Sequence, residues 1–283
     1  RLAKVLISND LSLMTLNFTK MNGAGNDFVV IDNLGFDRSL SGAQIEKLCD
    51  RHRGVGADGL LAVEPAEKGA DVKFRYYNAD GGEAEMCGNG ARCFGRYVSR
   101  LLDGDRSELT FETIAGTLRA EMIGEEVLIE MSEPFGLEIE SPVAIDTLGV
   151  PVHNLNTGVP HAVAFVEDVE ATEIVKNGAA IRYHGHYEPS GTNANFVQVL
   201  SPQHLLVRTY ERGVEGETLA CGTGITACAL IHHLLTGAPS PIKVTVRGGD
   251  DISIGFETQE DQKFANVTMT GPADFVFEGE IEV

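Results

Sequence analysis

Two short stretches of the chain share an unusual pattern, a cysteine followed directly by Gly-x-Gly. They are MCGNGA at 86–91 and ACGTGI at 220–225. Each opens an apolar run, Ala91–Leu102 or Ile225–Leu235, whose pattern predicts a buried helix. A thiol at a helix N-terminus lies where the backbone N–H groups and the helix dipole favour negative charge, so we expect a lowered pKa. The same N–H groups can hold a carboxylate. Two such sites suggest a pair of thiols acting from opposite sides.

Other motifs of the first half recur about 135 residues later in the same order, which indicates an internal duplication. The matched pairs are Gly25 with Gly158, Arg75 with Arg208, Cys87 with Cys221, and Met131 with Met269. We therefore interpret the chain as two homologous halves, 15–133 and 134–272. The tail 273–283 lies beyond the second repeat, and we expect it to pack on the first half.

Within each half, the pattern predicts a strand, an amphipathic helix, two strands, the cysteine turn with its buried helix, and short alternating strands. The amphipathic helices are expected at 41–51, with Ser41 and Gln44 as a capping box, and at 169–177. The predicted strands are Phe28–Asp32, Leu60–Val63, Val72–Tyr77, Leu109–Thr113, Thr117–Met122 and Val127–Met131 in the first half, and Ala162–Val166, Phe196–Leu200, Leu205–Tyr210, Ile242–Val246, Asp251–Phe256 and Ala265–Thr270 in the second. This order predicts an α+β fold of two pseudo-symmetric domains, each a curled, mixed or antiparallel β-roll around a central helix.

Charge and cysteine content narrow the class of partner. The 283 residues carry 22 Lys+Arg against 42 Asp+Glu, a formal net charge of −20, which argues against nucleic acid or an anionic membrane as partner. Five cysteines do not suggest a disulfide framework, so we expect the reducing cytoplasm. The sequence leaves a homodimer open. Met14 is a plausible natural start, and 1–13 are excluded from the predicted fold.

If the halves face each other, the two cysteine turns converge on one cleft. Inverting a stereocentre next to a carboxylate needs a base on one face and an acid on the other. A thiolate and a thiol can exchange these roles as the reaction reverses. The helix N–H groups would hold the carboxylate and stabilise the charge that develops on it. The pattern therefore predicts a racemase or an epimerase.

Several motifs, in this order, resemble the diaminopimelate epimerase family. They are GAGNDF at 23–28, NADG at 78–81, CGNGARC at 87–93, TGVPH at 157–161, ERG at 211–213 and ETLACGTG at 217–224. The resemblance extends from about residue 16 to the C-terminus. It implies a PLP-independent epimerase without cofactor or metal, which interconverts LL- and meso-diaminopimelate for lysine and peptidoglycan precursors. It also implies two pseudo-symmetric β-roll domains.

The resemblance carries roles to individual positions. Cys87 and Cys221 match the acid/base pair, and His161 and Glu211 match residues that tune the thiol pKa values. The positions that match substrate-binding residues are Asn26, Asn78, Gly88, Asn89, Asn193, Glu211, Arg212, Gly222 and Thr223. Amides and an Arg–Glu pair suit a substrate with an ammonium and a carboxylate at each end. Gly59 and Val159 stand where some members have Gln and Asn, so recognition of the distal end must differ there.

Other interpretations of these residues remain open. Cys49, Cys93 and Cys228 are best interpreted as small buried apolar residues. His184 with His186, and His232 with His233, lack partners at metal-ligand spacing, so core or surface roles are favoured. Asn26 and Asn78 could simply form turns, and Glu211 with Arg212 could be a structural ion pair. A proline-racemase-like enzyme, a thiol redox switch and an amino-acid-binding protein are the alternative functions.

Overall fold

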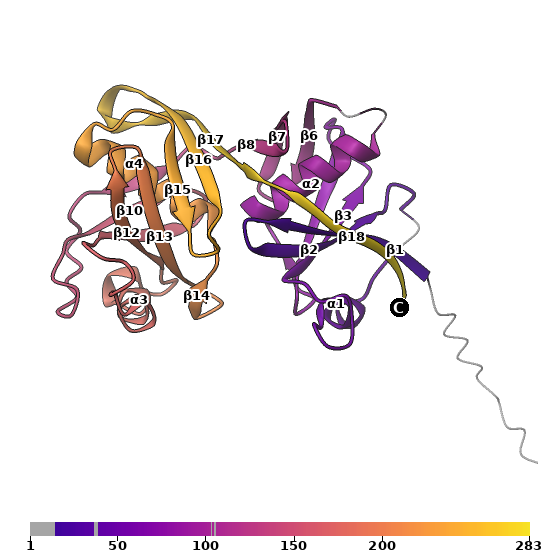
Figure 1. The fold of residues 1–283 in the computed structure, drawn as a ribbon, viewed down its shortest axis with the longest axis horizontal. Coiled ribbons are helices and arrows are strands. Elements are labelled where there is room, and N and C mark those ends of the chain that lie inside the picture. Colours follow the sequence, from indigo (N-terminus) through magenta and orange to yellow (C-terminus); the bar gives the residue numbers. More distant parts are fainter. Residues whose placement is uncertain (1–14, 37–38, 103, 105) are drawn as a thin grey trace, which may run out of the picture.

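The computed structural model describes residues 15–36, 39–102, 104 and 106–283, and it has two β-rich halves side by side (Figure 1). The predicted start at Met14 and the excluded stretch 1–13 lie outside the described residues. Each half contains a central helix and a shorter outer helix. The helices are α1 (Gly42–Cys49) and α2 (Gly88–Leu101) in the first half, and α3 (Ile174–Arg182), α4 (Gly222–Thr236) and the 3-10 turns η1 (Gly185–Tyr187) and η2 (Glu260–Gln262) in the second.

Every strand that the sequence predicts is present, with ends shifted by at most three residues. Additional strands lie at 15–23, 83–84, 135–138, 152–156, 216–218 and 274–282. The strands are β1 (Thr15–Gly23), β2 (Asn26–Asp32), β3 (Gly59–Glu64), β4 (Val72–Asn78), β5 (Glu83–Ala84), β6 (Glu108–Thr113), β7 (Gly116–Ile123), β8 (Glu126–Glu130), β9 (Phe135–Glu138), β10 (Val152–Asn156), β11 (Pro160–Phe165), β12 (Asn193–Ser201), β13 (His204–Glu211), β14 (Gly216–Thr218), β15 (Ile242–Val246), β16 (Asp251–Thr258), β17 (Phe264–Pro272) and β18 (Asp274–Glu282).

The two halves share one pairing scheme. In the first half, β1–β2, β3–β4, β6–β7 and β7–β8 are antiparallel, whereas β2–β3 and β4–β6 are parallel. In the second half, β10–β11, β12–β13, β15–β16 and β16–β17 are antiparallel, whereas β11–β12 and β13–β15 are parallel. The predicted class of two pseudo-symmetric, mixed β-rolls around central helices is confirmed.

The halves also exchange strands. β8 pairs with β17, which joins the two sheets. The chain then passes from β8 into β9, which pairs with β10, and from β17 into β18, which pairs with β1 along most of its length. In Figure 1 the yellow strand β18 runs from the second half across the first. Each half is thus completed by a strand that follows the last hairpin of the other.

The strands next to the central helices are buried on both faces. In β2, Phe28 and Val30 pack toward α2, while Val29 and Ile31 pack on the opposite face with Ile45 of α1. Such a two-sided strand reads as a continuous apolar run, as the sequence of β2 does. The core around α2 and the core around α4 form one cluster. The two helices therefore share one hydrophobic core.

The outer helices differ in how well the sequence predicts them. Ser41 and Gln44 form the expected capping box at the start of α1. The helix expected at 169–177 instead begins at Ile174. Asp168 Oδ1 accepts hydrogen bonds from the backbone N–H groups of Glu170 and Ala171, at 2.8 and 3.3 Å. This side chain closes a separate turn before the helix, so the predicted start is wrong.

Among the described residues, no helix combines the length and the apolar character that a bilayer-spanning segment needs.

Candidate active site

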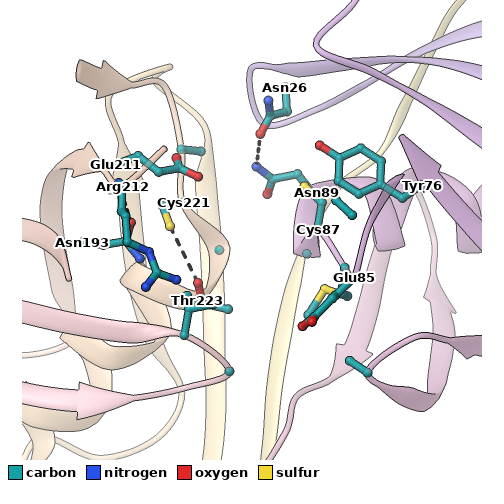
Figure 2. A pocket seen from close by; sticks show the side chains of 18 of the residues that line it. Asn26, Tyr76, Glu85, Cys87, Asn89, Asn193, Glu211, Arg212, Cys221 and Thr223 are labelled. Carbon is teal, nitrogen blue, oxygen red and sulfur yellow. Dashed lines mark hydrogen bonds between the residues drawn. The ribbon is translucent and has the colours of Figure 1, made fainter. Parts of the chain in front are cut away.

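The N-termini of α2 and α4 meet at a cavity of about 370 Å³ between the halves (Figure 2). Cys87 lines it from the first half and Cys221 from the second, on opposite sides of the gap. All the predicted site residues except His161 line this cavity. They are Asn26, Asn78, Cys87, Gly88, Asn89, Asn193, Glu211, Arg212, Cys221, Gly222 and Thr223.

The two helix N-termini pack against each other. A Cβ atom on Gly88 would lie 2.6 Å from the Cε of Met269 and 3.9 Å from the Cα of Gly222. A Cβ atom on Gly222 would lie 3.1 Å from the Met269 Sδ. A Cβ atom at either position would press on the flexible end of the Met269 side chain, so glycine at the first position of both helices lets the two starts approach closely. Met269 of β17 packs against both starts and forms the floor between them.

Cys87 is the N-cap residue of α2. Its Sγ accepts a hydrogen bond from the backbone N–H of Gly90 at 3.5 Å, so the helix start contacts the sulfur directly. The side chain of Asn89 is held by two neighbours: its Nδ2 donates to Asn26 Oδ1 at 2.8 Å, and its Oδ1 accepts from Arg92 Nη2 at 2.9 Å. Asn26 Nδ2 in turn donates to Asp58 Oδ2 at 2.8 Å. These bonds fix the orientation of both amides.

Cys221 is the N-cap residue of α4, and its Sγ lies 3.7 Å from Thr223 Oγ1. His161 lies behind Thr223, with its Nε2 2.9 Å from the same hydroxyl. Asn195 Nδ2 lies 3.2 Å from His161 Nδ1. An amide nitrogen only donates, so Nδ1 is the acceptor and the ring proton lies on Nε2. His161 then donates to Thr223, whose own hydroxyl hydrogen is left for the Cys221 sulfur.

His161 is buried, and this burial lowers its pKa to about 3. The ring is therefore neutral at physiological pH, in agreement with the hydrogen bond it accepts from Asn195. It acts as a fixed donor toward Thr223 and brings no positive charge to the site.

The net pKa shift of both thiols runs against the sequence expectation. Burial raises the pKa of Cys87 and of Cys221, and the nearby charge of Glu211 raises both further. Backbone N–H groups do lower the pKa of each thiol, as expected, but by less than burial raises it. The prediction of lowered pKa values is therefore wrong for this cleft, because it counted the helix and left out the cost of burying a thiolate.

Glu211 and Arg212 follow one another at the end of β13 and line the cavity. Arg212 Nη1 lies 3.3 Å from the carbonyl oxygen of Ser190, and the Arg212 backbone N–H donates to Asn193 Oδ1 at 2.8 Å. Within the part of the chain that the structure describes, neither charged side chain forms an ion pair. The structural ion pair considered from the sequence is thus not formed there, and the charges of both groups face the cleft (Figure 2).

The remaining cysteines and histidines have structural surroundings. Cys49, Cys93 and Cys228 are buried free thiols, as predicted. His232 Nε2 and His233 Nδ1 bond to the carbonyl oxygens of Pro202 and Ala238, at 2.9 and 2.7 Å. His186 lies 3.2 Å from Glu138. The described residues hold no group of three or more potential metal ligands.

Tyr76 and Glu85 are among the cavity-lining residues that sequence reasoning missed. Tyr76 lies two positions before Asn78 on β4, so the alternation of a strand places both side chains on one face. That spacing was the available signal. Of the two positions that depart from some family members, Val159 lines the cavity, whereas Gly59 lies behind Tyr76.

Comparisons with known proteins agree with this geometry. A family model described as diaminopimelate epimerase matches residues 18–135 and 153–276. The chain belongs to the diaminopimelate epimerase family. It is 43% identical to the diaminopimelate epimerase of Aquifex aeolicus over 94% of this chain and 98% of the relative. It is 44% identical to that of Archaeoglobus fulgidus over 94% and 96% of the two chains.

Two solved structures share the fold at low sequence identity. A PhzF-family phenazine biosynthesis protein from Bacillus anthracis has a TM-score of 0.73 at 16% identity, over 96% of this chain and all of the other. A hydroxyproline epimerase from Agrobacterium vitis has a TM-score of 0.69 at 17% identity, over 95% and 93%. These similarities concern the fold alone.

Proposed function

We propose that this chain interconverts LL- and meso-2,6-diaminopimelate, with Cys87 and Cys221 as the two acid/base groups and without PLP. The observation that carries the proposal is the position of the two thiols. Each lies at the N-terminus of a helix, and the two line one cavity from opposite halves. The named activity of the relatives supports this substrate, a precursor for lysine and peptidoglycan.

The reaction needs only these groups and the backbone. A thiolate on one side takes the α-hydrogen as a proton and becomes a thiol. The electron pair of the broken C–H bond moves toward the substrate carboxylate, where the N–H groups at the starts of α2 and α4 stabilise the charge. The thiol on the other side gives its proton to the opposite face of the carbon and becomes a thiolate. The reverse reaction exchanges the two roles.

Substrate binding adds positive charge next to the thiols. Because burial and Glu211 raise the pKa of both thiols, the thiolate needs a nearby cation. The α-ammonium of the substrate brings such a cation into the cavity. Glu211 is placed to hold that ammonium, and Thr223, backed by His161, is placed to donate to Cys221.

The other substrate contacts follow from the chemistry of the lining. Asn26, Asn78, Asn193 and Arg212 supply donors for carboxylate oxygens. Residues 15–133 and 134–272 act as the two domains that enclose the substrate, and the tail 273–283 belongs to the first through β18. The free cysteines fit a reducing compartment, so the cytoplasm is the proposed location.

The test is exchange of the α-hydrogen of LL-diaminopimelate in D₂O, together with turnover to the meso form. The intact enzyme should catalyse both. Cys87→Ala and Cys221→Ala should each lower epimerisation by roughly 10³-fold or more, because each removes one proton-transfer group. Cys228→Ala, in the same helix α4 but outside the cavity, is the control and should retain activity.

Three results would contradict the proposal. Full turnover by Cys87→Ala would exclude the two-thiol mechanism. Binding of the substrate without α-hydrogen exchange would favour an amino-acid-binding protein. Faster turnover of L-proline than of diaminopimelate would favour the proline-racemase alternative.

A further inference from the structure

Tyr76 lies where two cavities meet, and it has no part in the proposed function described so far. It lies on β4, is nearly buried, and lines both the thiol cavity and an adjoining cavity of about 630 Å³. Six residues line both spaces: Asn26, Tyr76, Asn78, Cys87, Glu211 and Arg212. A long substrate whose reacting carbon lies between the thiols would pass between these six residues if it extended into the second cavity. Figure 2 shows the Tyr76 ring on the Cys87 side of the first cavity.

The Tyr76 ring fills the space beside Gly59. A Cβ atom on Gly59 would lie 2.7 Å from the Cε2 of Tyr76 and 2.5 Å from the carbonyl oxygen of Tyr77. Gly59 pairs with Asn78 across β3 and β4, so it supports the Tyr76 ring from behind the cleft wall. The Tyr76 ring therefore occupies the space that a side chain at position 59 would need.

The Tyr76 hydroxyl donates a hydrogen bond to Asn78 Oδ1 at 2.8 Å. This bond uses the oxygen of the amide, so the Nδ2 group is turned the other way. No described residue accepts a hydrogen bond from that Nδ2, and the Asn78 side chain is exposed to the cleft. Asn78 is thereby presented to the substrate as a donor, which suits a carboxylate. Burial raises the pKa of Tyr76, so the phenol stays protonated and keeps this bond at neutral pH.

We propose that Tyr76 is a positioning residue for substrate specificity: its hydroxyl fixes the Asn78 amide as a donor to the substrate carboxylate remote from the reacting carbon. The inference rests on the proposed function and deepens it, because it names the group that orients one of the proposed substrate contacts. The ligand class is an amino acid with a second carboxylate far from the reacting centre.

The test is a double-mutant cycle on diaminopimelate epimerisation. Tyr76→Phe should raise KM about tenfold, the effect of losing one neutral hydrogen bond, with kcat changed less than twofold. In an Asn78→Ala background, the same substitution should have no further effect on KM, since the group that Tyr76 positions is gone. Tyr77→Phe is the matched control. Its hydroxyl accepts from Arg75 at 2.9 Å and lines neither cavity, so KM should not change.

An unchanged KM in Tyr76→Phe would overturn the inference, as would a fall in kcat alone. If the effects of Tyr76→Phe and Asn78→Ala on KM multiply in the double variant, Tyr76 acts independently of Asn78. That result would also overturn the inference. The proposed function fails separately, if the unmodified enzyme does not exchange the α-hydrogen of diaminopimelate.

Discussion

The starts of α2 and α4 have the same backbone design but different side-chain support. Both begin with a cysteine N-cap and a glycine packed on Met269. On α2, the next side chain is Asn89, held by an amide and by a buried arginine. On α4 it is Thr223, held by a neutral histidine. Only Thr223 approaches the sulfur of its own helix start, at 3.7 Å.

This contrast suggests how a duplicated scaffold serves an asymmetric task. The repeated backbone places two thiols and two helix N-termini around one cavity. The side chains behind them have diverged, so each thiol has its own surroundings. Cys221 is buried more deeply and has a hydroxyl partner, whereas Cys87 is partly exposed and depends on the N–H of Gly90. A two-base reaction gains from such tuning, because one thiol must be charged while the other is protonated.

Among the residues that support the two helix starts, Arg92 is expected to have the largest effect, and its counterpart in α4 is Thr226. Arg92 is fully buried, and its guanidinium donates to Asn89 Oδ1 and, at 3.2 Å, to the carbonyl oxygen of Pro272. Arg92→Met should lower kcat/KM about 100-fold, because Asn89 and then Asn26 lose their fixed orientation and the site loses a buried cation. Steady-state kinetics would measure this.

The free energy of unfolding of Arg92→Met shows whether a loss of activity comes from the site or from unfolding of the protein. Arg92→Met leaves no unpaired carboxylate among the described residues but removes the donor to Asn89 Oδ1 and to the Pro272 carbonyl oxygen, so we expect the free energy of unfolding to fall by about 1–3 kcal/mol. Urea denaturation would test this. Arg96→Met, one turn further along α2, is the control, since Arg96 Nη1 donates to the carbonyl oxygen of Ala273 instead. If Arg92→Met kept its activity within threefold of that of the unmodified enzyme, the side chains behind the start of α2 would not contribute to the reaction.

A smaller effect is expected on the other side, from Thr223. Thr223→Val keeps the shape but removes the hydroxyl that lies between His161 Nε2 and the Cys221 sulfur. We expect kcat/KM to fall about tenfold, because the Cys221 thiolate loses one donor. Thr226→Val, which removes a hydroxyl bonded to the carbonyl oxygen of Gly222 at 2.9 Å, is the control in the same helix. Equal losses in both variants would mean that the hydroxyl supports the helix rather than the thiol.

The sequence predicted the duplicated parts of the fold better than the parts that connect them. Strands with apolar runs, such as β2 and β15, could be located because burial leaves a local pattern. β9 and β18 were not predicted as strands. The tail 273–283 was expected to pack on the first half, but no local pattern indicates that it does so as a strand paired with β1. The start of α3 was misplaced because Asp168 forms a turn that resembles a helix start.

For the candidate site, too, the sequence predicted the features that a local motif encodes and missed those that depend on distant residues. The cysteine turns located the cavity, because a thiol before Gly-x-Gly is a local signal. The direction of the thiol pKa shift was not predictable, since it depends on burial by residues from both halves. Tyr76 was missed although it lies two residues from Asn78. The space for its ring is provided by Gly59 on the neighbouring strand, and this contact across the sheet has no local sequence pattern.

The smallest expected effect concerns Glu211, the one carboxylate whose charge raises the pKa of both thiols. An anion beside a thiol disfavours the thiolate, so neutralising Glu211 lowers the pKa of Cys87 and of Cys221. Activity that needs a thiolate is lost as pH falls through that pKa. In Glu211→Gln the acidic limb of the kcat/KM profile should therefore move to lower pH, by about one unit, even if the maximum falls because the substrate ammonium loses a partner.

The matched control for the pH profile is Glu85→Gln, an exposed carboxylate that lines the same cavity. Its charge is better screened by water than that of half-buried Glu211, so its removal should leave the limb in place. A limb that stays fixed in Glu211→Gln, or moves to higher pH, would mean that Glu211 does not set the thiol pKa values. Equal shifts in both variants would indicate that the acidic cavity as a whole sets them. The two helix starts would then share one electrostatic environment, and their different side chains would serve geometry alone.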